Sequence, residues 1–100
     1  MKHFIALFFF FTLSLQAQFQ VNGIVKDAST QKPLPFANII SEDGSSTISD
    51  VDGKFNMSLP SGKKQIRFTY VGYVSVDVLL KEGVSQVVNV KMEVDASLLK

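Results

Sequence analysis

The sequence has 100 residues, 46% of them hydrophobic and 19% charged, and this length permits one small domain at most. Lys and Arg number 10 against 9 Asp and Glu, and a net charge of +1 is too small to attract nucleic acid or an anionic membrane surface. Cysteine is absent, so we expect neither disulfides nor the cysteine-linked lipid anchor of a bacterial lipoprotein.

The N-terminus has the pattern of a secretory signal peptide. Lys2 and His3 form a basic start, and residues 4–15 are apolar apart from one Thr and one Ser. This run is shorter than the roughly 20 residues that span a bilayer as a helix, so we expect a signal-peptide helix over 1–17, with cleavage after Ala17. A buried core helix is the alternative, but four consecutive phenylalanines leave it no polar face. Cleavage removes Lys2, which leaves nine basic and nine acidic residues.

The chain after the signal reads as an all-β domain, because short alternating stretches are separated by Gly, Pro, Asp and Ser. The first strand is predicted at 20–27, with Val21, Gly23 and Val25 on one face. Asn-Gly at 22–23 ordinarily indicates a hairpin turn, but no strand fits before it. Gly23 is therefore predicted to mark a close backbone approach or a bulge.

A loop at 28–35 contains two prolines, and three further strands are predicted at 36–41, 46–49 and 54–59. Tight turns at 42–45 and 50–53 separate them. The alternation is clearest in the last of the three strands, where three apolar side chains share one face: Phe55, Met57 and Leu59.

The remaining strands are predicted at 65–70, 74–80 and 88–93, and Gly72 interrupts the chain between the first two. Their core-facing residues are Ile66, Phe68, Tyr70, Val74, Val76, Val78, Leu80, Val88, Val90 and Met92. Seven strands with one apolar face each predict a Greek-key β-sandwich over residues 18–93. Residues 94–100 complete no element and are predicted to begin a linker to a further domain.

The mature chain has little of the chemistry that enzymes use. His3 is the only histidine and leaves with the signal, so the commonest general base and all nitrogen and sulfur metal ligands are missing. Asp50 and Asp52 could act as a carboxylate pair, but a solvated turn gives no reason for the perturbed pKa values such work needs. We therefore predict a domain that is not an enzyme and has no cofactor.

Asp50-x-Asp52-Gly53 also resembles part of a calcium loop, which makes Asp50 and Asp52 weak metal candidates. The twelfth position of such a loop requires Glu and is Ser61 here. The favoured interpretation is structural, since Asp side chains cap turns and Asp-Gly supplies a positive φ.

Aromatic residues offer a possible binding platform of Phe68, Tyr70 and Tyr73. Core positions for Phe68 and Tyr70 are the favoured alternative. Tyr73 follows Gly72 outside the alternation, so it is the better candidate for a partly exposed ring. Phe36, at the loop exit, is the other aromatic residue without a core assignment.

Four segments in order resemble the carboxypeptidase regulatory-like domain and cover about residues 19–92. They are Val21-x-Gly23-x-Val25-x-Asp27, Pro33-Leu34-Pro35-Phe36-Ala37-Asn38-Ile39, Ser49-Asp50-x-Asp52-Gly53-x-Phe55 and Phe68-x-Tyr70-Val71-Gly72-Tyr73. The resemblance implies a transthyretin-like (prealbumin-like) sandwich of about seven strands. The structural positions that it implies are Gly23, Pro35, Asp50, Asp52, Gly53, Phe55, Phe68, Tyr70, Gly72 and Tyr73.

The resemblance also implies an accessory role without catalytic residues. A signal peptide followed directly by this domain resembles the start of TonB-dependent outer-membrane receptors of the SusC type in Bacteroidetes. The expected partner is then a receptor plug and barrel, or another envelope protein, at the periplasmic face of the outer membrane. Any membrane association would come through a C-terminal part that these 100 residues lack. A free-standing periplasmic or secreted binding or adhesion module is the alternative. The hydroxyisourate hydrolases share the fold but rely on histidines and a C-terminal tail that are missing here.

Overall fold

The computed structural model describes residues 18–62 and 65–99, so the signal-peptide prediction lies outside the described part. Eight strands and one short 3-10 helix make up that part. They are β1 (Gln18–Asp27), β2 (Asn38–Ser41), β3 (Ser46–Ile48), β4 (Lys54–Pro60), β5 (Gln65–Thr69), β6 (Val76–Leu79), β7 (Gln86–Val87), β8 (Val90–Met92) and η2 (Ala96–Leu99). Within it, no helix is both long enough and apolar enough to cross a bilayer.

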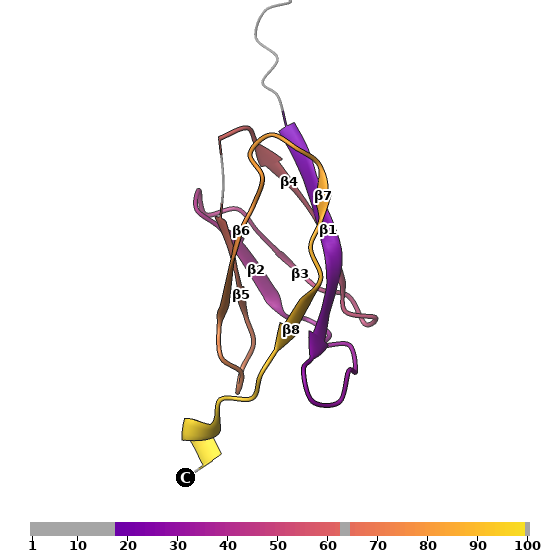
Figure 1. Cartoon of the computed structure of the whole chain (residues 1–100), viewed down its shortest axis with the longest axis vertical. Coiled ribbons are helices and arrows are strands. Elements are labelled where there is room, and N and C mark those ends of the chain that lie inside the picture. The colour runs from indigo at the N-terminus through magenta and orange to yellow at the C-terminus, as the bar shows by residue number, and fades with distance from the viewer. Residues whose placement is uncertain (1–17, 63–64, 100) are drawn as a thin grey trace, which may run out of the picture.

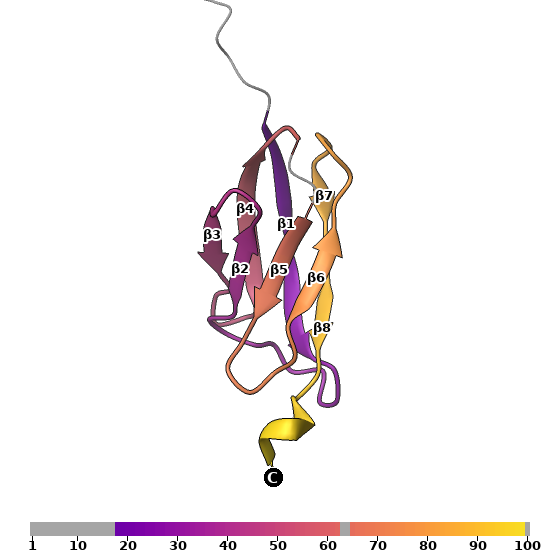
Figure 2. The same cartoon turned by 90° about the vertical axis from the view of Figure 1, so that its left-hand side faces the viewer.

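Two four-stranded sheets pack face to face, which confirms the predicted all-β sandwich (Figures 1 and 2). One sheet has the order β3-β2-β5-β6, and in the other β1 lies between β4 and the successive strands β7 and β8. Neighbours such as β1–β4 and β2–β5 are far apart in sequence, as Greek-key connections require. β1 runs antiparallel to β4 but parallel to β7 and β8.

The core lies between the sheets and is made by alternate residues of the strands. The predicted alternation of β1 and β4 holds, because inward residues are buried at every second position. Phe55 and Phe68, one from each sheet, meet edge to face with ring centroids 5.3 Å apart and planes at 77°. This geometry is the favoured one for aromatic pairs.

Several strand predictions are corrected at their ends, and β2 begins at Asn38 where a strand from Phe36 was predicted. β1 starts two residues earlier than predicted, because Gln18 and Phe19 already pair with Pro60 and Leu59 of β4. β6 starts at Val76, and Val74 is 49% exposed where a core position was predicted. Val74 donates its N–H to the Glu93 carbonyl at 2.8 Å, so it joins the end of the chain instead of pairing with β5.

Of the predicted seventh strand at 88–93, β8 covers only Val90–Met92, and β7 (Gln86–Val87) lies before the predicted range. Val88 and Asn89 form a break between the two strands. A Cβ on Gly23 would lie 1.7 Å from the Val88 carbonyl oxygen, so the predicted close approach of backbone is confirmed. The Ile24 N–H, which faces the break, donates to the Asn89 side-chain oxygen at 3.2 Å. A side chain therefore replaces the backbone acceptor, and alternation alone could not reveal the break.

The chain beyond Glu93 forms structure where no element was predicted. Val94 pairs with Tyr73 in an isolated bridge, and the Asp95 N–H donates to the Gly72 carbonyl at 2.9 Å. The 3-10 helix η2 then begins at Ala96, and the Asp95 carboxylate accepts a hydrogen bond from the Ser97 N–H. The segment after Glu93 is thus attached to the turn at Gly72, which has a positive φ of 87°.

A buried hydroxyl closes the turn that leads into β2. The Ala37 N–H donates to Ser49 Oγ at 2.8 Å, and that hydroxyl donates to the Leu34 carbonyl at 2.6 Å. Pro35 and Phe36 occupy the centre of this turn, and Phe36 has a φ of 63°. Ser49 is fully buried, so the backbone groups it joins are not available to water.

Ser49→Ala is expected to lower the free energy of unfolding by about 1–3 kcal/mol, because it leaves a buried N–H and carbonyl without partners. Urea unfolding measures the change. Ser58→Ala is the matched control, since Ser58 is an exposed residue with one hydrogen bond to Gln18. Equal effects of the two substitutions would contradict a bridging role for Ser49.

Candidate functional site

The sequence motifs come together at the end of the sandwich where β1 ends. The Val25 N–H donates to the Gly53 carbonyl at 2.8 Å, and the Leu34 N–H donates to the Val25 carbonyl at 2.9 Å. β1 is thus hydrogen-bonded both to the turn after β3 and to the loop at 28–35. The motif residues lie where the backbone of one segment contacts that of another.

Asp50, Asp52 and Gly53 form the tight turn before β4. One carboxylate oxygen of Asp50 accepts hydrogen bonds from the backbone N–H groups of Asp52 and Lys54, both at 2.9 Å. Gly53 has a φ of 76°, and a Cβ there would lie 2.6 Å from the Val25 carbonyl oxygen. Asp50 therefore acts as a turn cap, and the turn requires glycine at position 53.

The metal hypothesis for Asp50 and Asp52 receives no further ligand from the fold. Among residues 18–62 and 65–99, no three Asp, Glu, His or Cys side chains lie together as a ligand set. One of the two Asp50 carboxylate oxygens accepts hydrogen bonds from two backbone donors, as a turn cap does.

The three aromatic residues considered as a platform do not lie on one surface. Phe68 is fully buried against Phe55. Tyr70 lies just beyond β5 and is half-buried, where a core position was predicted. Its ring is 5.4 Å from that of Tyr73, with the planes tilted by 43°. Phe36 is 58% exposed, so it is the more accessible of the two rings without a core assignment.

Tyr73 contacts a carboxylate that the sequence reasoning did not single out. Its hydroxyl donates to Asp27 Oδ2 at 2.5 Å. The other oxygen of Asp27 accepts from the backbone N–H groups of Ser29 and Thr30 at 2.7 and 2.9 Å. Asp27 is only 7% exposed, and these donors satisfy it in place of water. The sequence signal was an Asp on the inward face of a predicted strand.

The hydrogen bond from Tyr73, and next that from the Thr30 N–H, hold the pKa of Asp27 below its usual value of 3.8. The same contact raises the pKa of Tyr73 above 10.0. Each direction follows from stabilisation of the charged carboxylate and of the neutral phenol. The contact links the end of β1 to the segment that carries Gly72.

Acid unfolding tests this contact. Because the pKa of Asp27 is lower in the folded state, its contribution to stability is present above pH 3.8 and is lost as pH falls through the folded-state pKa. Tyr73→Phe removes the largest cause of the lowered pKa, so the thermal midpoint is expected to fall less steeply below pH 3.8 than in the parent.

The Asp77 pKa is also lowered, by hydrogen bonding to Arg67, so the difference between parent and variant is the quantity to compare. Tyr70→Phe is the matched control, because no hydrogen bond of the Tyr70 hydroxyl is present among the described residues. Parallel pH profiles for the parent and Tyr73→Phe would contradict the role of the contact.

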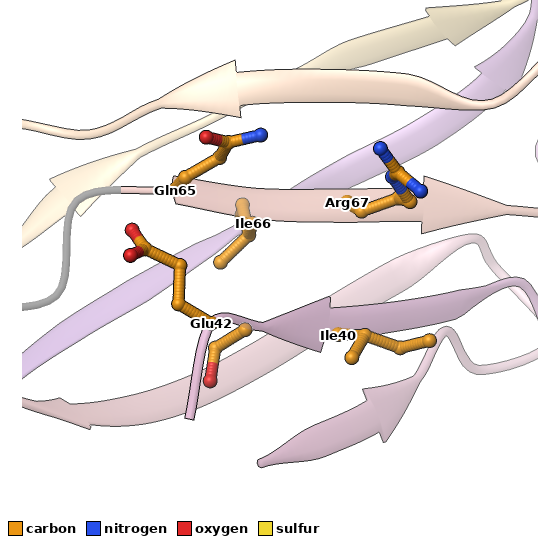
Figure 3. Close-up of a pocket in the computed structure, with 6 residues that line it drawn as sticks. Ile40, Glu42, Gln65, Ile66 and Arg67 are labelled. Carbon is orange, nitrogen blue, oxygen red and sulfur yellow. The ribbon is translucent and has the colours of Figure 1, made fainter. Parts of the chain in front are cut away.

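A surface hollow between β2 and β5 has a volume of about 360 Å³ (Figure 3). Its lining residues are Ile40, Ser41, Glu42, Gln65, Ile66 and Arg67. Arg67 is engaged with Asp77 of β6 through two hydrogen bonds of 2.7 and 3.1 Å. Both side chains are about half exposed, and such surface pairs contribute little to stability.

A second hollow of about 310 Å³ lies on the other sheet. Two lysines from adjacent strands, Lys26 and Lys91, take part in its lining. Neither lining contains a His or a Cys.

Comparisons with known proteins agree with the fold. The sequence model of the family described as CarboxypepD_reg-like domain matches residues 21–100. A curated relative, TonB-dependent receptor P3 of Formosa agariphila, is 32% identical over 81 residues. That alignment covers 80% of this chain but only 8% of the receptor, so the chain spans a small part of its relative's length.

Solved structures support the sandwich at the level of the fold. The Bacillus anthracis TIE protein is similar with a TM-score of 0.50 at 20% identity, over 78% of this chain and 17% of that one. GBS52, the minor pilin of Streptococcus agalactiae, has a TM-score of 0.50 at 14% identity, over 81% of this chain and 46% of the pilin.

Proposed function

This chain belongs to the CarboxypepD_reg-like domain family, and from that premise we propose that it is a non-catalytic accessory domain of an exported bacterial envelope protein. More specifically, we propose that it forms the N-terminal extension of a TonB-dependent outer-membrane receptor and serves nutrient uptake. The observation that carries this proposal is the 32% identity with a TonB-dependent receptor over 80% of the chain.

The placement in the cell follows from the N-terminal pattern. Residues 1–17 act as the signal peptide in this proposal, residues 18–93 form the domain, and the following residues lead towards the receptor plug. The domain then lies in the periplasm or at the periplasmic face of the outer membrane. In this proposal the domain braces or modulates the plug. The motif residues described above hold the fold of the domain together.

A free-standing binding or adhesion module is the second candidate, and the exposed ring of Phe36 is the observation that favours it. Phe36 also has the left-handed backbone conformation that residues other than Gly, Asn and Asp adopt rarely. Tyr73, its proposed companion in an aromatic patch, is instead bound to Asp27. The receptor proposal is therefore better supported.

Cell fractionation separates the two proposals. An antibody against residues 20–92 is used to probe soluble and outer-membrane fractions, with and without heating of the samples. The receptor proposal expects a large, heat-modifiable band in the outer membrane. A small soluble band at the mass of the 83 residues that follow Ala17 would overturn it and support the free-standing module.

A further inference from the structure

The outer face of the sheet that contains β1 carries a hollow with a basic lining. Its volume is about 310 Å³, and it is more enclosed than the hollow in Figure 3. The residues that line it are Ile24, Lys26, Gln31, Asn89, Val90 and Lys91. They come from β1, the loop after it and the region of β8, which lie side by side in Figure 1.

Two positive charges meet across adjacent strands at this hollow. Lys26 of β1 and Lys91 of β8 are direct partners in the parallel register, and neighbouring strands lie about 4.8 Å apart. Lys54 of β4 is the register partner of Ile24 but does not line the hollow. Like charges opposite one another destabilise a sheet unless something offsets them.

No carboxylate offsets these charges in the part of the chain that the structure describes. The lining contains no Asp or Glu, and neither Lys26 nor Lys91 has an ion pair there. Glu93, the nearest acidic residue along the chain from Lys91, forms no ion pair there either. The ion pair that is present, Arg67–Asp77, belongs to the opposite sheet.

The break between β7 and β8 adds a neutral donor beside the lysines. The Asn89 side-chain oxygen accepts from the Ile24 N–H, so its amide NH₂ remains as a donor. That NH₂ has no partner among the described residues. Gln31, at the edge of the hollow, is held in a left-handed conformation with a φ of 62°, and strained backbone of this kind concentrates at ligand sites.

We propose that this hollow is a carboxylate-binding site that accepts an Asp or Glu side chain of a partner polypeptide. The ammonium groups of Lys26 and Lys91 pair with the carboxylate, and the Asn89 amide donates a hydrogen bond to it. Charge-assisted hydrogen bonds of this type are shorter and stronger than neutral ones. Ile24 supplies apolar surface for the side-chain methylenes.

The choice of a polypeptide as the partner rests on the proposed function, in which the domain lies against another part of an envelope protein. The carboxylate specificity rests on the lysine pair and the Asn89 amide, and does not depend on the proposed function. If the peptide did not bind, the fractionation result and the receptor proposal would be unaffected. If the protein were found in the soluble fraction, the binding experiment would still test the lysine site.

Binding is tested with the folded mature chain and three probes. They are a hexaglutamate peptide, a hexaglutamine peptide of the same length, and a trimer of galacturonic acid. Two-dimensional NMR follows the backbone amides and the Asn89 side-chain amide during each titration. Hexaglutamate is expected to shift the signals of Ile24, Lys26, Asn89 and Lys91, with an affinity that falls as salt is raised, and hexaglutamine is expected to shift none.

The double variant Lys26→Gln/Lys91→Gln is expected to weaken hexaglutamate binding roughly tenfold, as loss of two exposed charge pairs would. Lys32→Gln/Lys81→Gln removes the same charge elsewhere and is expected to leave the affinity within about twofold of the parent. The thermal midpoint of the first variant is expected to be equal to or higher than that of the parent, because a like-charge contact is removed.

Three results would overturn the proposal. Equal weakening by the two double variants would show that binding depends on net charge alone. Tighter binding of the galacturonic acid trimer than of hexaglutamate would assign the site to an acidic sugar. A lower thermal midpoint for Lys26→Gln/Lys91→Gln would show that the lysines serve the fold.

Discussion

Phe68→Ala is expected to lower the free energy of unfolding by about 3–5 kcal/mol, the usual cost of removing a buried aromatic ring. Phe68 is fully buried and meets Phe55 of the other sheet edge to face. The substitution therefore leaves a cavity where the two sheets touch. A domain of this size has about 5–15 kcal/mol of total stability, so the loss is a large fraction of it. Urea unfolding monitored by circular dichroism measures the change.

Phe36→Ala is the matched control, since it removes the same ring from a site that is 58% exposed. We expect its effect to stay within about 0.5 kcal/mol. In a double-mutant cycle, Phe55→Ala and Phe68→Ala are expected to show a coupling of about 0.5–1.5 kcal/mol beyond burial alone. Near-parental stability of Phe68→Ala would contradict the placement of this ring between the sheets.

The strands and their inward faces were predictable because their information is local. Alternation over five or more residues fixes which side chains face the core, as in β4, where Phe55, Met57 and Leu59 are all buried. It could not fix where strands break or change partner. The last strand was predicted at 88–93, which leaves out β7, and the break before β8 begins at Val88, whose backbone closely approaches Gly23.

The polar contacts near the end of β1 could not be predicted from the sequence either, because they join residues that are far apart in the chain. The Asp27–Tyr73 hydrogen bond joins residues 46 positions apart. Ser49 closes a turn that begins 15 residues before it. In each case the residue type fits a loop or a strand equally well, and its partner is set by how the sheets pack. The sequence predicted the end of β1 and the positions of the turns, but not the hydrogen bonds that join these segments.

The pairing of Lys26 with Lys91 depends on which strands are neighbours in the sheet and not on the local sequence pattern. Alternation places Lys26 and Lys91 on the outward faces of two separate strands, because Val25 and Val90 beside them face the core. The parallel β1–β8 register brings them together on one face, and the break at Asn89 places an amide beside them. A parallel contact between the first and last strands cannot be inferred from hairpin signals, because no short turn connects the two strands.

Gly23→Ala is expected to destabilise the domain by at least about 3 kcal/mol, the upper end of the usual cost of overpacking. The added Cβ would lie 1.7 Å from the Val88 carbonyl oxygen and 2.6 Å from its carbonyl carbon. Both atoms belong to the backbone, so no side-chain rotation relieves the clash. β1 is held by β4 on its other side, and the strain must therefore move the β7–β8 edge outward. Thermal and urea unfolding measure the loss.

Hydrogen exchange locates the damage and separates it from a general loss of stability. The Val88 N–H donates to the Asn22 carbonyl at 2.7 Å, and the Ile24 N–H donates to Asn89, so these amides are expected to lose protection first. Gly72→Ala is the matched control: Gly72 has a φ of 87° but no atom within 4 Å of an added Cβ. Its cost is that of a left-handed alanine, about 1–2 kcal/mol. Suppose that Gly23→Ala lowered the free energy of unfolding by no more than Gly72→Ala. The β7–β8 edge would then be free to separate from β1. The lysine site spans the contact between β1 and β8, so it would not be held in place.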